Sequence, residues 1–213
     1  MTKKERAALA AEALRELYPD VSCSLKYSTP LEMLLATQMS AQCTDASVNR
    51  VTETLFKKYT CAEDFANADL DELQQDIRSI GLYRNKSKNI IACCQRILEC
   101  YGGQVPSTME ELLTLPGTGR KTANLILGEV FGKPAVVVDT HCIRLTNRIG
   151  LVNTGVPEKI EAELKKLIPP EEQLALCHRF VFHGRAMCNA RSPKCGLCPL
   201  KNFCKYYKKI TKR

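Results

Sequence analysis

The sequence predicts an all-α protein. Apolar residues recur with the spacing of a helix along most of its 213 residues, and its 45% hydrophobic content is that of an ordinary globular protein. Only one short stretch, residues 134–138, reads as extended. Because a single strand without a partner cannot form a sheet, we interpret this stretch as a connecting segment.

Each expected helix is an amphipathic segment, and several have a recognisable start or end. Pro30 is typical of the first turn of a helix, and Gly81 and Gly132 are typical of a helix end. The stretch S-T-M-E at 107–110 has the pattern of a capping box before another helix. In chain order we expect helices at residues 3–18, 30–39, 44–59, 69–80, 83–101, 111–115, 120–131, 140–149, 157–168 and 171–185.

The charge of the chain indicates a polyanionic partner. Lys and Arg number 31 against 23 Asp and Glu, which gives a formal net charge of +8. Residues 185–213 contain nine Lys or Arg and no Asp or Glu, whereas acidic residues gather at 63–76. No run has the length of a membrane span, and the basic N-terminus lacks the apolar core of a secretory signal. We therefore expect an intracellular protein, cytoplasmic and nucleoid-associated, with no membrane partner.

Four of the twelve cysteines form a cluster with the spacing Cys188-x6-Cys195-x2-Cys198-x5-Cys204. In a reducing cytosol, metal ligation explains such a cluster better than disulfides do. Four thiolates suit tetrahedral zinc or a four-iron cluster, and the spacing does not choose between them. Cys177 is kept as a candidate neighbour of the cluster. We interpret the others as small core residues: Cys23, Cys43, Cys61, Cys93, Cys94, Cys100 and Cys142.

A tight turn is predicted for P-G-T-G at 116–119, and a helical segment begins after it with Arg120 and Lys121. Two glycines around one small residue let the chain reverse where a Cβ would clash. The backbone N–H groups of such a turn and of the helix after it are unpaired, which suits a phosphate. From these residues alone, Lys121 is equally well interpreted as a phosphate contact or as a reactive amine.

Several other residues have ordinary structural interpretations when they are taken alone. Asp139 follows an apolar run and precedes a helix, which is the position of an N-cap. Gln42 reads as a surface amide, Leu82 after Gly81 as a core residue, and Asp45 as a helix-start residue. None of these residues indicates a site by itself.

Six short motifs together resemble one family, endonuclease III, the helix-hairpin-helix DNA glycosylases with AP lyase activity. They occur in order along nearly the whole chain, without large insertions. One such motif is weak, because a helix-hairpin-helix alone marks only nonspecific DNA binding, but six in register are specific. The motifs are S-A-Q-C-T-D at 40–45, I-G-L-Y at 80–83, L-P-G-T-G-R-K-T-A-N at 115–124, V-D-T-H at 138–141, H-G-R at 183–185 and the four-cysteine spacing at 188–204.

The resemblance implies two helical domains with a DNA-binding groove between them. Residues 22–133 would form a helical-barrel domain that contains the helix-hairpin-helix at about 107–132. Residues 1–21 and 134–213 would form an iron–sulfur cluster domain, in which a C-terminal loop holds a 4Fe-4S cluster through Cys188, Cys195, Cys198 and Cys204. The expected partner is double-stranded DNA with damaged bases or abasic sites, bound by a monomer.

The same resemblance implies the chemistry of base excision repair on oxidised pyrimidines. Lys121 would attack C1′ of the sugar and form a Schiff base, after which β-elimination cuts the strand. The attacking amine must be neutral, and both the positive end of the helix dipole and the adjacent Arg120 disfavour an ammonium there. Asp139 would be the active-site carboxylate. Gln42 and Leu82 match residues that fill the gap left by a flipped nucleotide.

Further DNA contacts follow from the position of the motifs. The turn would grip phosphates through its backbone N–H groups, and the basic loop around the cluster would add phosphate contacts. We interpret residues 208–213 as a solvated basic tail. The expected DNA contacts of these two kinds are Leu115, Gly117, Gly119, Arg120, Arg185, Arg191 and Lys194, and Asp45 and His141 are expected near the pocket.

Three alternative functions also fit a chain with an iron–sulfur cluster. A monofunctional adenine glycosylase of the same superfamily resembles the chain around the cluster, but it lacks the lysine at the position of Lys121. A noncatalytic iron–sulfur DNA-binding protein would make Lys121 and Asp139 incidental. A ferredoxin-like electron carrier would need an acidic surface, and the basic balance of the chain argues against it.

Overall fold

The computed structural model describes residues 1–211, and this part of the chain is built from helices and contains no strand. The all-α prediction is confirmed. The stretch expected to connect helices forms neither a helix nor a strand, and Ala135 to Val138 in it are buried. None of the helices in residues 1–211 combines the length and the apolar character needed to cross a bilayer.

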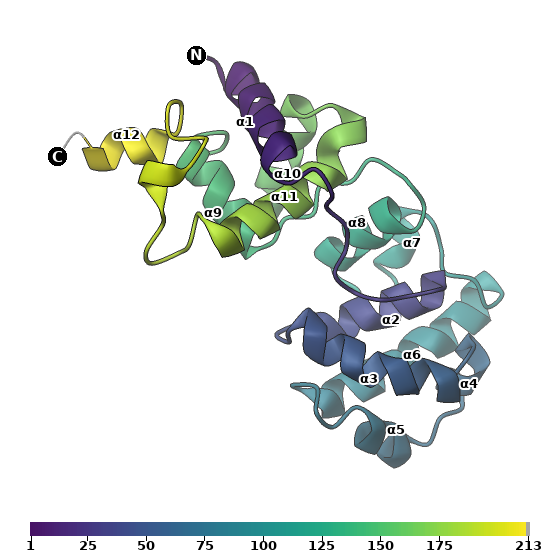
Figure 1. Cartoon of the computed structure of the whole chain (residues 1–213). Helices are drawn as coiled ribbons and strands as arrows, with labels where there is room; N and C mark the ends of the chain where they lie inside the picture. Colours follow the sequence, from purple (N-terminus) through teal and green to yellow (C-terminus); the bar gives the residue numbers. More distant parts are fainter. Residues whose placement is uncertain (212–213) are drawn as a thin grey trace. The chain divides into compact units, whose positions relative to one another are not determined.

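The chain divides into two compact units. The central unit is Cys23–Lys133. The terminal unit combines Met1–Ser22 with Pro134–Arg213, of which the last two residues lie outside the described part. The terminal unit therefore brings the N-terminal helix together with the C-terminal third of the chain (Figure 1).

One helix forms the core of the central unit. Helix α2 packs against α3, α6 and α8, and the seven consecutive residues from Met33 to Met39 are all buried. A helix buried on all sides carries any polar side chain in that run into the interior, as happens for Gln38. The helices of this unit are α2 (Pro30–Ser40), α3 (Asp45–Lys58), α4 (Ala62–Ala66), α5 (Leu70–Asp76), α6 (Tyr83–Tyr101), α7 (Met109–Leu112) and α8 (Arg120–Glu129).

The structure differs from the expected helices mainly where they are short. Helix α4 was not expected, and it packs against α6, with Phe65 buried. Helix α5 ends at Asp76, although Ile77 and Ile80 beyond it are buried as their spacing predicts. The N-cap of α7 is Thr108, whose hydroxyl accepts from the Glu111 N–H. Helix propensity alone does not determine where such short helices form, because a helix of one or two turns is stable only when tertiary contacts support it.

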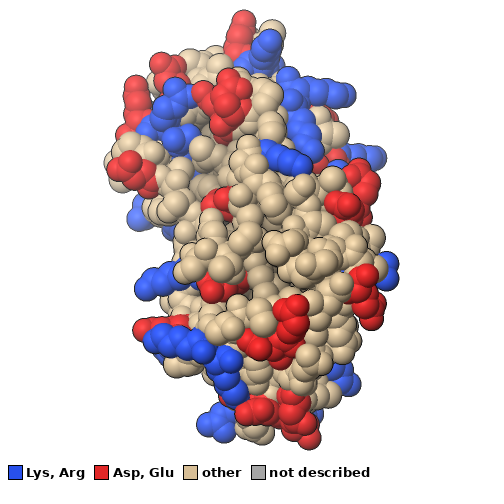
Figure 2. All heavy atoms as spheres, turned by 90° about the vertical axis from the view of Figure 1, so that its right-hand side faces the viewer, with Lys and Arg blue, Asp and Glu red and all other residues tan. Residues whose placement is uncertain are grey.

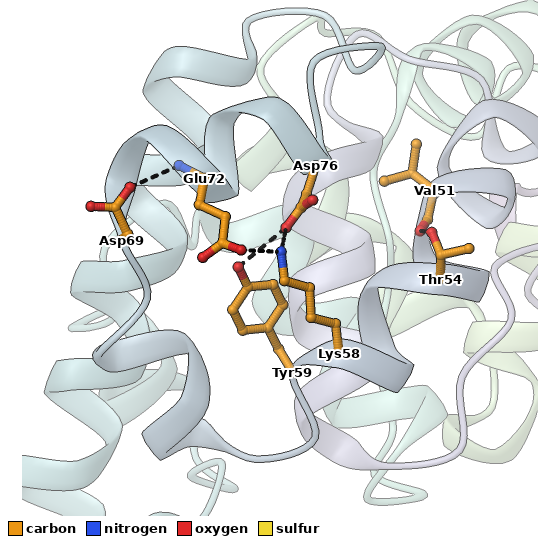
Figure 3. A network of polar contacts seen from close by, with 7 residues as sticks. All are labelled: Val51, Thr54, Lys58, Tyr59, Asp69, Glu72 and Asp76. Carbon is orange, nitrogen blue, oxygen red and sulfur yellow. Dashed lines mark hydrogen bonds and ion pairs between the residues drawn. The ribbon is translucent and has the colours of Figure 1, made fainter.

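The acidic stretch at 63–76 is largely used within the fold. Asp69 caps α5 by accepting from the Glu72 N–H at 2.9 Å (Figure 3). Lys58 at the end of α3 donates to Asp76 at 2.6 Å and pairs with Glu72 at 2.8 Å. The Tyr59 hydroxyl donates to the same Asp76 carboxylate at 3.2 Å. The hydrogen bonds to Asp76 and Glu72 raise the pKa of Lys58. These carboxylates therefore join α3 to α5.

The terminal unit is held by contacts that are distant in sequence. Arg6 of α1 donates to the Gly150 carbonyl at 3.0 Å, and the aliphatic chain of Lys205 lies so close to Gly150 that a Cβ there would overlap it. Helix α9 packs against α11 and α12, and α11 packs against α1. The elements of this unit are α1 (Lys3–Leu17), α9 (Thr140–Ile149), α10 (Pro157–Leu167), η1 (Pro170–Glu172), α11 (Gln173–Ala186), η2 (Cys195–Leu197) and α12 (Lys205–Thr211).

Within the described part of residues 208–213 the expected solvent exposure is confirmed, and the structure adds that this part is helical. Lys208 and Lys209 are exposed, but they belong to α12, which packs against α9. Residues 212 and 213 lie outside the described residues. Basic and acidic side chains intermingle on the face shown in Figure 2, so the net charge of +8 is not a uniform coat on that face.

Candidate functional site

The turn before α8 is fixed by a buried side chain from α2. The Gln38 amide donates to the Pro116 carbonyl at 3.0 Å and to the Thr118 hydroxyl at 3.1 Å. Thr118 is itself buried, and its N–H donates to the Leu115 carbonyl at 3.0 Å. The sequence offered no signal for Gln38, because its two partners lie about eighty residues further along the chain. The turn is therefore held rigidly from its inner side.

The two glycines of the turn are needed for different reasons. Gly117 has a left-handed φ of 75°, and a Cβ on it would lie 3.0 Å from the Asn89 Cβ and 3.3 Å from the Gln38 Cδ. Gly119 is the N-cap of α8 with an ordinary φ of −96°, and a Cβ on it would meet no atom within 4 Å. The expectation of a clash is thus confirmed for Gly117 and wrong for Gly119. Packing within the chain leaves Gly119 free to carry a side chain.

Lys121 lies in the first turn of α8 and is exposed. Three charged groups act on the thiol of Cys23. Burial, Glu129 and Asp45 raise the pKa of Cys23 to about 11, and Lys121 acts in the opposite direction. These groups therefore share one neighbourhood of the central unit. Asp45, which the sequence motifs indicated, is one of the charged groups around Cys23. Glu129 is another, and the motifs did not indicate it.

Asp139 is the N-cap of α9, as its position in the sequence predicts. Its Oδ1 accepts from the Cys142 N–H at 2.7 Å. The buried run Val136–Val138 leads directly into it, so the carboxylate is anchored on both sides while remaining half-buried. The cap uses one of the two carboxylate oxygens.

The V-D-T-H and H-G-R motifs meet where α9 packs on α11. A Cβ on Gly184 would lie 2.8 Å from Arg144 Nη2 and would also overlap the His141 ring. Arg144 Nη2 lies 3.0 Å from His141 Nδ1 and donates to the Gly184 carbonyl at 3.1 Å. Gly184 is therefore required for this close approach. The structure places His141 directly after Asp139 and Thr140, with its ring against α11.

Gln42 and Leu82 share an unusual backbone conformation. They are the two non-glycine residues among residues 1–211 with a left-handed φ, at 58° and 60°. Such a conformation costs about 1–3 kcal/mol and persists only where the surroundings impose it. Both side chains are exposed, Leu82 to 56%, so the interpretation of Leu82 as a core residue is wrong. Each residue sits at a helix boundary, Gln42 after α2 and Leu82 as the N-cap of α6.

The four clustered cysteines line a single cavity in the terminal unit. Burial and the neighbouring sulfurs of Cys188, Cys204 and Cys195 raise the pKa of Cys198 to about 11. Within residues 1–211 no three His, Cys, Asp or Glu side chains are arranged to hold one metal ion. Four thiols spread around a shared cavity form a donor set that suits a polynuclear iron–sulfur cluster, in which each cysteine binds a different iron.

Cationic and buried groups from α9 and α11 surround this cavity. Arg148 donates to the Asn189 carbonyl at 2.7 Å, lies 3.4 Å from Cys188 Sγ, and stacks on the Tyr206 ring at 4.5 Å. Burial lowers the pKa of His183 to about 4, and its Nε2 lies 3.3 Å from Cys198 Sγ. A guanidinium beside the thiols suits the negative charge of a thiolate-ligated cluster. The sequence motifs did not single out Arg148.

Cys177 is not a neighbour of this cavity. It is buried in α11, where its thiol is hydrogen-bonded with that of Cys142, and this contact and burial raise the pKa of Cys142. The pair explains two of the remaining cysteines as core residues. By contrast, Cys100 is exposed, so its interpretation as a core residue is wrong.

The expected phosphate contacts are exposed wherever they carry a charge. Arg120 begins α8 in the central unit, and Arg185 lies in the last turn of α11. Arg191 and Lys194 lie in the loop around the four cysteines. Of the apolar and glycine positions, Leu115 is buried, and Gly117 and Gly119 are exposed. The structure therefore leaves the four charged side chains accessible to a partner.

Comparison with protein families agrees with the motifs. Residues 35–170 match the HhH-GPD superfamily of base excision DNA repair proteins, and residues 188–204 match the iron–sulfur binding domain of endonuclease III. The second match begins and ends at the first and last clustered cysteine. The chain binds a 4Fe-4S cluster.

The chain is also similar to individual proteins over nearly its whole length. Endonuclease III of Synechocystis is 48% identical over 95% of this chain and 93% of its own, and that of Bacillus subtilis is 45% identical over 100% and 98%. A solved structure of a trapped endonuclease III–DNA covalent intermediate is 44% identical, with a TM-score of 0.94, over 99% of this chain and 100% of its own. The fold, the motifs and these similarities lead to one conclusion: the chain belongs to the endonuclease III family of base excision DNA repair proteins.

Proposed function

We propose that this protein is a bifunctional DNA glycosylase and AP lyase in which Lys121 is the nucleophile. The observation that carries the proposal is the likeness of the chain to an endonuclease III that was trapped covalently on DNA. A covalent intermediate requires a nucleophilic group, and Lys121 is an exposed amine at the motif position expected for it. The central unit would be the helical-barrel domain with the helix-hairpin-helix, and the terminal unit the iron–sulfur domain.

The proposed reaction uses Lys121 as a neutral amine. Its Nζ forms a bond to C1′ as the damaged base leaves with a proton, and opening of the sugar ring gives a protonated Schiff base. The Schiff base makes a 2′ proton acidic, and loss of this proton expels the 3′ phosphate by β-elimination. Water then hydrolyses the Schiff base and releases the lysine. Every group that this series of reaction steps needs comes from the chain, from the DNA or from water.

Asp139 would assist this nucleophile as a carboxylate. An anion stabilises the positive charge that develops on the sugar as the base leaves, and a carboxylate can shuttle protons to and from the amine. Because the N-cap uses only Oδ1, capping α9 and acting on the substrate are compatible roles. Lys121 and Asp139 are eighteen residues apart and each lies at a helix start.

Gln42 and Leu82 would enter the duplex when the damaged nucleotide is flipped. Flipping leaves an unstacked gap, which an apolar tip and an amide can fill. Their exposure and their imposed left-handed backbone support this role, because a side chain held outward at an energetic cost is poorly explained by packing. His141 and Asp45 would lie near the reacting nucleotide.

The turn before α8 would hold a phosphate through backbone N–H groups. Leu115 anchors the turn from inside, and the side-chain-free Gly119 leaves the start of α8 open to a phosphate. Further phosphate contacts would come from Arg120, Arg185, Arg191 and Lys194. Such contacts fix the position of the duplex without reading its sequence.

A matched pair of alanine substitutions distinguishes the roles of the two glycines in this turn. Gly119→Ala is expected to lower thermal stability only slightly, because alanine is a poorer N-cap than glycine but its Cβ meets no atom of the chain. It should weaken binding to duplex DNA about fivefold or more, because a Cβ would block a hydrogen bond of roughly 1 kcal/mol. Gly117→Ala is expected to lower the free energy of unfolding by at least about 1 kcal/mol, because its φ is left-handed. Thermal melting and fluorescence anisotropy measure both. Unchanged DNA affinity in Gly119→Ala would contradict phosphate binding at this turn.

The cluster would act as a structural clamp on the basic loop. Cys188, Cys195, Cys198 and Cys204 would be its ligands, and iron–sulfur bonds would hold the loop at 188–204 in one shape. Arg148 supports that shape from α9 through bonds to the Asn189 and Ala190 carbonyls, at 2.7 and 2.8 Å. The loop would thereby present Arg191 and Lys194 to the DNA backbone.

Oxidised pyrimidines are the proposed substrates, acted on by a monomer inside the cell, where the protein would associate with the nucleoid. A panel of duplexes, each with one lesion, tests this preference. We expect release of oxidised thymine or cytosine bases to be at least about tenfold faster than release of oxidised guanine or mispaired adenine, which is the discrimination of roughly 1–3 kcal/mol that pocket shape supplies. Faster release of mispaired adenine would instead favour the adenine glycosylase.

Borohydride trapping on abasic-site duplex DNA tests the proposed function as a whole. Borohydride reduces a Schiff base to a stable amine, so the protein should become covalently attached to the DNA. A noncatalytic DNA-binding protein would bind the duplex and form no adduct.

A further inference from the structure

The loops that carry Gln42 and Leu82 are fastened to one another. The Gly81 N–H donates to Cys43 Sγ at 3.2 Å, and a Cβ on Gly81 would lie 3.4 Å from the same sulfur. Gly81 directly precedes Leu82, and Cys43 directly follows Gln42. The two exposed side chains therefore project from loops whose separation is set by neighbouring residues.

A buried lysine joins both loops. Lys86 lies in the first turn of α6 and is 6% exposed. Its ammonium group donates to the Met39 carbonyl at 2.8 Å, the Ala41 carbonyl at 2.6 Å and Cys43 Sγ at 3.4 Å. These three acceptors match the three hydrogens of an ammonium group. Its own backbone N–H donates to the Leu82 carbonyl at 3.1 Å.

The position of this ammonium group is electrostatically favourable. The carbonyls at the C-terminal end of α2 lack partners within the helix and form its negative end. A cation placed there satisfies them and fixes the point at which the chain leaves α2 for Gln42. Burying a lysine is costly unless it is fully hydrogen-bonded, and here the three acceptors of the ammonium group come from the last turn of α2 and the loop that follows it.

We propose that Lys86 is a positioning residue for base flipping, because it holds the Gln42 loop and the Leu82 loop at one spacing. This inference rests on the proposed function, in which these two side chains enter the duplex. Lys86 itself touches neither DNA nor the reacting atoms. Its contribution is to keep Gln42 and Leu82 in the left-handed conformation that directs them outward. Without it, the two tips would move independently and fill the gap poorly.

The test uses a fluorescent base to report insertion. A duplex carries an uncleavable abasic analogue next to 2-aminopurine, which brightens when its stacking is disturbed. The cluster-loaded parent protein should brighten it, and Leu82→Ala should abolish most of the signal. Lys86→Met should reduce the signal at saturating protein by at least about fivefold, because small misplacements of a positioned group have large effects. Lys88 is an exposed lysine on the same helix, so Lys88→Met is the matched control and should give the same signal as the parent.

A second measurement separates positioning from general damage. Single-stranded abasic DNA needs no base flipping, so Lys86→Met should form the borohydride-trapped adduct on it at a rate within about twofold of the parent, while trapping on duplex DNA falls about tenfold. An equal loss on both substrates would overturn the inference and indicate damage to the fold. A normal 2-aminopurine signal in Lys86→Met would also overturn it.

The outcomes distinguish this inference from the proposed function. If Leu82→Ala loses the signal and Lys86→Met keeps it, insertion stands and the role of Lys86 falls. If Leu82→Ala keeps the signal, the proposed insertion itself is wrong, and the role of Lys86 falls with it. If Lys86→Met does not fold, Cys43→Ala replaces it, because this change removes the sulfur between the two loops and leaves both carbonyl bonds to Lys86 intact. In Cys43→Ala, the rate of borohydride trapping should fall more on duplex DNA than on single-stranded DNA. The same rate relative to the parent on both substrates would refute the proposal that these contacts hold the two loops together.

Discussion

Lys121→Gln is expected to abolish the borohydride-trapped adduct with abasic-site DNA and to lower strand cleavage by roughly a thousandfold or more, the scale on which loss of a nucleophile acts. Glutamine keeps helix propensity and hydrogen bonding at the first turn of α8, but its amide nitrogen is not nucleophilic. Because Lys121 is exposed, its removal should leave the fold intact. Trapping, gel-resolved strand cleavage and thermal melting measure the three effects.

The same variant decides between the two local interpretations of Lys121. If this lysine only contacted a phosphate, Lys121→Gln would bind DNA more weakly and would still be trapped. If it is the nucleophile, the adduct should disappear while binding to an abasic analogue stays within about threefold, since a nucleophile acts in the chemical step and contributes little to binding of the ground state. Lys88→Gln removes an exposed lysine elsewhere in the central unit and should retain the adduct.

Cys198→Ala is expected to remove the cluster and to disorder the loop at 188–204. The parent protein should be brown and contain about four irons per chain, and the variant should lose both properties. Because ligand binding and folding are coupled, the free energy of unfolding should fall by at least about 2 kcal/mol, which lowers the melting temperature of a protein of this size by about 4–8 °C. Absorbance, iron analysis and thermal melting measure these changes.

Cys100→Ala is the control for this change, because Cys100 is an exposed cysteine of α6 in the other unit. It should keep iron, colour and melting temperature. DNA affinity should fall in Cys198→Ala and not in Cys100→Ala, since the loop that presents Arg191 and Lys194 is shaped by the cluster. A colourless parent protein containing one zinc would contradict the cluster.

Several features follow from the sequence because their causes are local. Helix α6 runs from Tyr83 to Tyr101 as its apolar spacing predicts. Asp139 caps α9 because a carboxylate before a helix reaches the free N–H groups of the first turn. The four cysteines line one cavity because short spacings keep their thiols together. In each case the residues that interact are close in the sequence, and even the four cysteines span only seventeen positions.

Other features required the tertiary structure. Gln38 holds the turn at 116–119 from α2, yet nothing in its neighbourhood marks it, because its partners lie about eighty residues away. Helix α12 forms against α9, although its local sequence resembles a charged tail. The difference between Gly117 and Gly119 was equally invisible, since it depends on whether Asn89 and Gln38 approach.

The sequence by itself determined the all-α class, most helix positions, the family and the motif residues that include Lys121 and Asp139. Only the tertiary structure decided that Leu82 points outward in a strained conformation, that Lys86 joins its loop to that of Gln42, and that Arg148 lies beside the clustered cysteines. The physical reason is the range of the interactions. Helix periodicity and capping act over one or two turns, whereas buried hydrogen bonds and close approaches of helices form between segments that only folding brings together.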